Sequence, residues 1–419
     1  MMSTNELTRR RFLAHTGAAT VAAGSLAVMR ATPAWASAPT TGRTLVVVFC
    51  RGGADGLSIV PPVGASEYYV ARPTIAVSPS AARALGGAHP SSMFGLHPAA
   101  SRISGLYDQG KVAIVNSAGL LVDTRSHFDA QAYMEAGVED TTLSATGWAG
   151  RWLAATASQS DHPLRSVAIG GALPASLRGG DAVAASGFGS LSLFSWGPSA
   201  ALVTANTADL YGRSGVHPLL ATWAQPTIDT IANISTLGST DRPTAFPDTE
   251  LGNNLWPIAR LIEAGFPVEV AHADMSSWDT HDAMGSATDT GARMYGQVSE
   301  LDSALGAFFD RIGAAADRVT VVVVTEFGRR TYENSSGGVD HGRAFPLLVI
   351  GGGVNGGVYG DWRGLAAPNL DDGDVAVTTD YRTVISELMA KRLGATSSQL
   401  SGVFPRFAAT SGWLGVVTT

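Results

Sequence analysis

Residues 319–343 read VTVVVVTEFGRRTYENSSGGVDHGR. The first seven are all valine or threonine, a β-branched run typical of a strand that is buried on both faces. The chain then reaches Glu326 and a polar, glycine-rich loop that ends at His341. Because a buried carboxylate is costly without a partner, Glu326 indicates either an ion pair with Arg329 or Arg330 or a functional site.

Similar apolar runs and helical patterns alternate along the chain. The predicted strands are 44–50, 111–119, 166–169, 267–271, 319–325 and 346–350, and the predicted helices are 99–109, 126–136, 297–312 and 379–393. This alternation predicts an α/β fold with a mostly parallel central sheet and helices on both faces. Residues 172–250 are rich in Ser, Gly, Ala and Thr with weak periodicity, which predicts an insertion or cap region within one domain that spans 37–419.

The N-terminus reads as an export signal. Thr8–Leu13 (TRRRFL) is similar to the twin-arginine signature, an apolar stretch follows, and Ala34–Ala36 (AWA) supplies a cleavage site. We expect cleavage after Ala36, and thus a periplasmic, cell-envelope or extracellular protein handled by the twin-arginine translocase. The apolar stretch is shorter than the ~20 residues of a membrane span, so no stable span is expected after cleavage.

Composition excludes several classes of protein. The net charge is −7, lysine occurs only at 111 and 391, and the arginines are scattered, so no nucleic-acid partner is expected. Cys50 is the single cysteine, which rules out an intrachain disulfide. Residues 351–356 fit G-x-G-x-x-G, but no helix pattern follows them, so a dinucleotide site is not predicted.

Carboxylates and imidazoles follow the predicted strands. In an open parallel sheet, ligands bind beyond the carboxyl ends of the strands, where these side chains would gather. The polar groups at these ends include Asp55, Ser126, His127, Asp279, His281, Glu326 and His341. Carboxylate and histidine together form the ligand set of Zn²⁺ or a similar divalent ion. Individually, Asp55 also fits a turn, Ser126 fits a helix cap with Asp129, and His341 fits a structural histidine.

The sequence also resembles a known family. LVVVFCRGGADGLSIVPP (45–62), SHFDAQAYMEAG (126–137), WDTHD (278–282), TEFGR (325–329), DHGRAFPLLVIGGGVNGGVYGDW (340–362) and TTDYRTVISELMAKRLG (378–394) resemble the DUF1501 proteins, within the alkaline-phosphatase/sulfatase-like superfamily. The resemblance implies that superfamily's fold and one or two divalent ions. The metal ligands that it implies are Asp55, Asp279, His281, Glu326 and His341.

The resemblance implies catalytic roles as well. Ser126, or alternatively Thr124, would be the nucleophile, Arg125 or Arg329 would stabilise developing negative charge, and His127 completes the candidate catalytic set. The expected reaction is metal-dependent hydrolysis of a phosphate or sulfate ester, on a small molecule or an envelope polymer.

One position departs from the superfamily pattern. Phe327 stands where the superfamily places a metal-binding histidine after the acidic residue, and phenylalanine cannot bind a metal. The open alternatives are a single metal, a second site altered to use Asp340 or His127, and no metal. The rival interpretation of the whole chain is a secreted binding or assembly protein on a degenerate hydrolase fold.

Overall fold

The computed structural model describes residues 42–141, 144–157, 162–191 and 241–419, together with 206, 209, 210, 226–231, 234 and 237. The predicted signal peptide, residues 1–36, lies outside the described residues, as does much of the predicted insertion at 172–250, so both remain predictions. Within the described chain, no helix has the length and apolar character needed to cross a membrane.

A nine-stranded sheet forms the centre of the molecule. Its order is β10-β4-β9-β8-β1-β7-β5-β6, and β13 also pairs with β4. The strands are β1 Thr44–Cys50, β4 Val112–Gly119, β5 Ser166–Ile169, β6 Val183–Ala185, β7 Val270–Met275, β8 Val319–Val324, β9 Phe345–Gly351, β10 Gly357–Tyr359 and β13 Thr379–Asp380. Only β9 runs antiparallel to its neighbours, β4 and β8, so the predicted mostly parallel sheet is confirmed.

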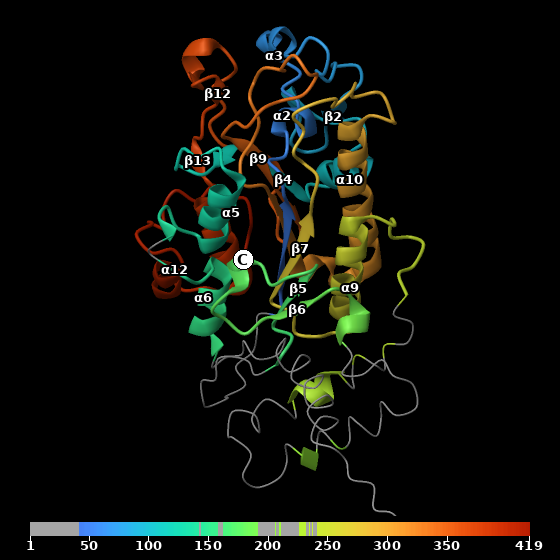
Figure 1. Cartoon of the computed structure of the whole chain (residues 1–419), viewed down its shortest axis with the longest axis vertical. Helices are drawn as coiled ribbons and strands as arrows, with labels where there is room; N and C mark the ends of the chain where they lie inside the picture. Colours follow the sequence, from blue (N-terminus) through green and yellow to red (C-terminus); the bar gives the residue numbers. More distant parts are fainter. Residues whose placement is uncertain are drawn as a thin grey trace, which may run out of the picture.

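Helices cover both faces of this sheet (Figure 1). One face packs against α4 (Ser101–Asp108), α9 (Glu250–Glu263) and α10 (Arg293–Ile312). The other face packs against α5 (His127–Ala136), α6 (Trp148–Ala155), α11 (Tyr381–Leu393) and α12 (Ser397–Val403). The short helices α2 (Gly56–Ile59) and α3 (Ser66–Ala71) follow β1, and two small sheets pair β2 (Arg83–Leu85) with β3 (Ser91–Leu96) and β11 (Leu370–Asp371) with β12 (Asp374–Val375).

The central strands are apolar throughout because both of their faces are covered. In β1, Val46 and Val48 belong to the core under α9 and α10, whereas Val47 and Phe49 belong to the core under α11. Strand side chains alternate between the two faces, so a strand between two helical layers needs an apolar residue at every position. The valine run of β8 meets the same requirement, and all of its residues are buried.

Candidate metal centre

Four polar side chains meet where β1, β7 and β8 end. His127 is the first residue of α5, Asp279 and His281 lie in the loop after β7, and His341 lies in the loop before β9. The donor atoms of His127, Asp279 and His341 all lie within 4.8 Å of one another. His281 joins them, because its Nε2 lies 2.9 Å from Nε2 of His341.

The histidines converge on a single carboxylate oxygen. The Nε2 atoms of His127, His281 and His341 lie 3.6, 3.1 and 3.5 Å from Oδ1 of Asp279. Zinc bonds of about 2.0–2.1 Å in a tetrahedral site place neighbouring donor atoms about 3.3 Å apart. The three separations from Oδ1 of Asp279 are therefore close to those around one small divalent ion.

The other ring nitrogen of each histidine is already used. Nδ1 of His127 lies 2.8 Å from Oε1 of Glu326, Nδ1 of His281 lies 2.8 Å from Oδ1 of Asp340, and Nδ1 of His341 lies 2.7 Å from the carbonyl of Arg125. Carbonyls and ionised carboxylates only accept hydrogen bonds, so each Nδ1 carries the hydrogen. In the neutral ring, each Nε2 then presents its lone pair to the centre of the cluster. Metal-binding histidines are oriented in the same way.

No group in the described chain donates a hydrogen bond to these Nε2 atoms. Nε2 of His127 is buried and has no hydrogen-bond partner among the described residues. Between His281 and His341, two lone pairs would face each other at 2.9 Å unless a proton or a cation lay between them. The donor set therefore fits a bound divalent ion better than it fits a structural hydrogen-bond network.

The ionisable groups of the cluster hold the protonation states that a bound cation would need. Burial raises the pKa of Asp279, but the hydrogen bond and charge of Arg329 outweigh it and hold that pKa below its ordinary value. The pKa of Asp340 is lowered by its hydrogen bond with His281. Burial lowers the pKa of His341, which favours the neutral form that binds metals. By contrast, the hydrogen bond to Glu326 raises the pKa of His127, so a proton competes most strongly with a metal at that residue.

Comparisons with known proteins agree with the resemblance seen in the sequence. The family described as "Protein of unknown function (DUF1501)" matches residues 235–400. The predicted DUF1501 relationship is confirmed over this segment. It contains Asp279, His281, Glu326 and His341, whereas His127 lies outside it. No curated protein matches the chain.

Solved structures of the alkaline-phosphatase superfamily are similar to the chain. A protein of this superfamily from Vibrio parahaemolyticus is 12% identical with a TM-score of 0.35, over 83% of this chain and 71% of that one. The lipoteichoic acid synthase LtaP from Listeria monocytogenes is 11% identical with a TM-score of 0.34, over 82% and 74%. The sulfatase PsFucS1 from Pseudoalteromonas sp. is 12% identical with a TM-score of 0.34, over 75% and 64%.

Glu326 occupies a different place from the one expected. It is fully buried, and its Oε1 accepts from the Gly52 amide at 2.9 Å, from Nε2 of Gln131 at 2.9 Å and from Nδ1 of His127. Burial raises its pKa, but these hydrogen bonds outweigh burial and lower it. Glu326 therefore orients His127, and its carboxylate lies outside the group of His127, Asp279 and His341 donor atoms, unlike the ligand position that the resemblance implied. The ion pair with Arg329 or Arg330 is absent as well, because neither arginine is among its described partners.

Phe327 forms the apolar wall of the cluster. Its ring is buried, and its centroid lies 4.8 Å from the ring of His127 and 4.8 Å from the ring of His341. The residue that departs from the superfamily pattern thus packs against two candidate ligands. In this position it restricts how the two imidazoles rotate.

Asp55 does not join the candidate ligands. Both of its oxygens accept from the buried Arg72, at 2.5 and 2.8 Å, and Ser58 donates to it at 2.5 Å. Burial raises the pKa of Asp55, but the charge of Arg72 outweighs burial and lowers it. The expected metal ligand is therefore one half of a buried ion pair, because Arg72 in the segment after α3 neutralises it.

The two arginines that were predicted to stabilise negative charge, Arg125 and Arg329, already have other partners. Arg329 is buried and donates to the carbonyls of Gly53, Val339 and Trp278 as well as to Oδ1 of Asp279, so it fixes Asp279 and offers nothing to a substrate. The guanidinium of Arg125 is paired with Asp372 and Asp374 of the β11–β12 hairpin.

Ser126 caps α5, as the capping pattern predicted. Its Oγ accepts from the Asp129 amide at 3.4 Å, and its own amide donates to Oγ1 of Thr124 at 3.2 Å. It directly precedes the candidate ligand His127, which keeps its predicted nucleophilic role open.

Sequence reasoning missed the residues that hold the centre together. Gly52 has a φ of +113°, and a Cβ there would lie 2.6 Å from the amide nitrogen of Asp279. The consecutive glycines after β1 were a signal of such a close approach. Gln131 lies four residues after His127 on the same face of α5, a spacing that could have predicted their shared partner, Glu326.

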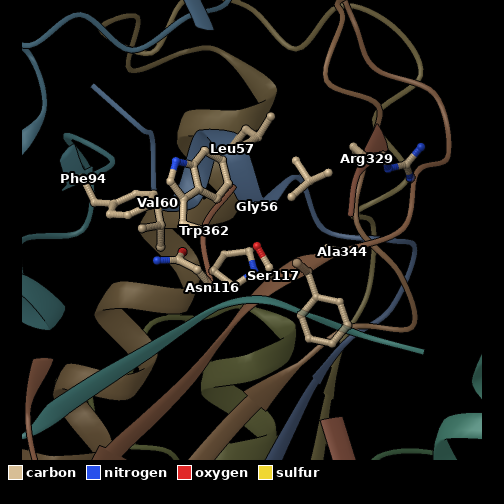
Figure 2. A pocket seen from close by; sticks show the side chains of 12 residues that line it. Gly56, Leu57, Val60, Phe94, Asn116, Ser117, Arg329, Ala344 and Trp362 are labelled. Carbon is tan, nitrogen blue, oxygen red and sulfur yellow. The ribbon is translucent and has the colours of Figure 1, made fainter. Parts of the chain in front are cut away.

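A small cavity lies behind Arg329 (Figure 2). Asn116 and Trp362 also line it, and neither Nδ2 of Asn116 nor Nε1 of Trp362 has a hydrogen-bond partner in the described part of the chain. Its volume of about 20 Å³ exceeds the ~10–15 Å³ that one water needs. The cavity therefore suits a single buried water, and it is too small for an ester substrate.

Proposed function

We propose that this protein is a metal-dependent hydrolase of phosphate or sulfate esters, with one divalent ion held by His127, Asp279, His281 and His341. The observation that carries the proposal is the convergence of three Nε2 atoms on Oδ1 of Asp279 within 3.1–3.6 Å. A bound Zn²⁺ or similar ion would act as a Lewis acid toward an ester oxygen. The partly exposed side chains of the cluster leave it accessible to a substrate.

Other residues orient the candidate ligands and supply the nucleophile. Glu326, Asp340 and the Arg125 carbonyl fix the imidazole orientations, and Arg329 fixes the carboxylate. Ser126 is the proposed nucleophile. Its Oγ would attack phosphorus or sulfur, its proton would pass to the oxygen of the leaving alcohol, and water would then cleave the serine ester to release phosphate or sulfate. The place of Ser126 at the N-terminus of α5 supports this role, since the free amides of a first helical turn stabilise negative charge.

The test combines metal analysis with an ester screen. Purified protein is expected to contain one equivalent of a transition metal by elemental mass spectrometry and to hydrolyse p-nitrophenyl phosphate or p-nitrophenyl sulfate. Asp279→Asn and His341→Gln should each lose the metal and the activity, whereas His89→Gln, at an exposed histidine, should keep both. A folded, metal-free protein whose properties do not change in Asp279→Asn would contradict the proposal.

A non-catalytic binding protein is the second candidate. Phe327 supports it, because an apolar ring stands where the superfamily places a metal-binding histidine. A protein that contains the metal but hydrolyses neither ester, and whose Ser126→Ala variant is indistinguishable from wild type in both assays, would favour this candidate.

We also propose that residues 1–36 direct export by the twin-arginine translocase to the periplasm, envelope or exterior. Two adjacent arginines, an apolar stretch and an A-x-A site support this. N-terminal sequencing of the exported protein should start at Ser37. Arg9→Lys together with Arg10→Lys should leave the uncleaved protein in the cytoplasm.

A further inference from the structure

Three arginines lie close in the chain to residues of the candidate metal centre. Arg125 lies two residues before His127, Arg330 directly follows Arg329, and Arg343 lies two residues after His341. They come from three different loops. Two of them touch the centre through their backbones: the carbonyl of Arg125 accepts from Nδ1 of His341, and the amide of Arg330 donates to the carbonyl of Asp340.

An acidic hairpin holds these arginines. It joins β11 to β12, and its carboxylates are those of Asp371, Asp372 and Asp374. Arg125 lies 3.2 Å from Asp372 and 2.7 Å from Asp374. Arg330 lies 3.6 and 3.5 Å from the same two residues. In Figure 1, β12 lies near the same end of the molecule as α3.

The two shared aspartates differ in how firmly they are held. The Asp374 side chain is fully buried, whereas that of Asp372 is 77% exposed at the tip of the hairpin. Exposed ion pairs contribute little to stability, so the carboxylate of Asp372 is easily displaced. Asp374 anchors the hairpin, and Asp372 is an exposed competitor for the same arginines.

Two of the three arginines, Arg125 and Arg343, have an unused donor in the described structure. The Nε atoms of Arg125 and Arg343 are buried and have no hydrogen-bond partner among the residues that the structure describes. A guanidinium has five donors in a planar fork that matches the oxygens of phosphate, sulfate or carboxylate. A tetrahedral anion could use more of these donors than one aspartate does.

We propose that Arg125 and Arg330 form a second anion subsite, which the carboxylate of Asp372 occupies in the unliganded protein. The inference rests on the proposed function and makes it more specific. The substrate class is an ester that carries a second anionic group, phosphate, sulfate or carboxylate, close to the bond that is cleaved. The second group replaces Asp372, so the hairpin selects multiply charged substrates over singly charged ones.

The test is calorimetric titration of the purified, full-length protein with inorganic sulfate. Removing the charge in Asp372→Asn removes the competitor. An exposed pair of about 0.2–1 kcal/mol implies about 1.4- to 5-fold tighter sulfate binding in this variant. Arg125→Gln and Arg330→Gln should each weaken binding at least tenfold. Asp310→Asn is the matched control, since Asp310 is an exposed aspartate paired with Arg102 on α10, and it should bind sulfate like wild type.

Metal content, measured on every variant, separates the two proposals. If Asp372→Asn binds sulfate no more tightly than wild type, or if Arg330→Gln binds it equally well, the subsite is refuted while the metal centre stands. Failure of both wild type and Asp372→Asn to bind millimolar sulfate refutes it as well. Arginine-dependent sulfate binding by a wild-type protein that contains no metal would support the subsite and refute the proposed hydrolase.

Discussion

Glu326→Gln tests how the buried strand end supports the metal centre. Oε1 of Glu326 accepts three hydrogen bonds of 2.8–2.9 Å, one of them from Nδ1 of His127. Glutamine keeps the shape and one acceptor oxygen but removes the charge that makes His127 a stronger ligand. Loss of such a partner typically weakens metal binding 10- to 100-fold, which is about 1.4–2.7 kcal/mol.

The assay is competition for Zn²⁺ between the protein and a fluorescent chelator, with urea unfolding of the metal-free protein measured in parallel. Glu387→Gln is the matched control, because Glu387 is also fully buried and accepts from Lys391 at 2.7 Å and from two backbone amides, those of Leu414 and Gly415. Each variant exchanges charge-assisted hydrogen bonds for neutral ones, a loss of about 1 kcal/mol per bond. Both should therefore lose stability, and only Glu326→Gln should lose metal affinity.

Two results would refute this reasoning. If Glu326→Gln binds Zn²⁺ within twofold of wild type, the carboxylate does not act through His127. If Glu387→Gln weakens metal binding as much as Glu326→Gln does, the effect is one of general stability and not of ligand orientation.

Asp55→Asn should lower the free energy of urea unfolding by about 3–5 kcal/mol, because it leaves Arg72 charged and buried. The fraction that stays folded should keep its metal. Metal loss without destabilisation would restore Asp55 as a ligand. Gly52→Ala should also destabilise the protein by at least 1 kcal/mol, since φ is +113° and the new Cβ would meet the Asp279 backbone; an unchanged urea midpoint would contradict the observed close approach. Zn²⁺ affinity should fall as pH falls, because a proton competes for Nε2 of His127, whose pKa is raised by the hydrogen bond of its Nδ1 to a carboxylate. The loss of Zn²⁺ affinity should therefore begin above the ordinary histidine pKa of about 6.5. Protons released when Zn²⁺ binds should make the calorimetric enthalpy depend on the buffer. A Zn²⁺ affinity that does not change between pH 6 and 8 would argue against histidine ligation.

Several features of this protein were determined by the sequence alone. The valine run at 319–325 and the apolar run at 44–50 predicted strands buried on both faces, because only two-sided burial requires an apolar residue at every position. The structure places β8 and β1 within a residue of those bounds. The concentration of carboxylates and histidines beyond the strand ends likewise predicted that Asp279, His281 and His341 lie close together, since parallel strands end at one edge.

The exact role of each side chain at that edge was decided only by the tertiary structure. Asp55 and Glu326 both follow buried strands, and their local sequences did not distinguish them from ligands. Arg72 neutralises the first carboxylate, and His127 and Gln131 on α5 engage the second. These partners come from other segments of the chain, so their contacts depend on how helices pack on the sheet and not on local propensity. A carboxylate forms hydrogen bonds and ion pairs only with groups within about 3 Å of it, so the packing of the helices on the sheet determined the role of each of these two carboxylates.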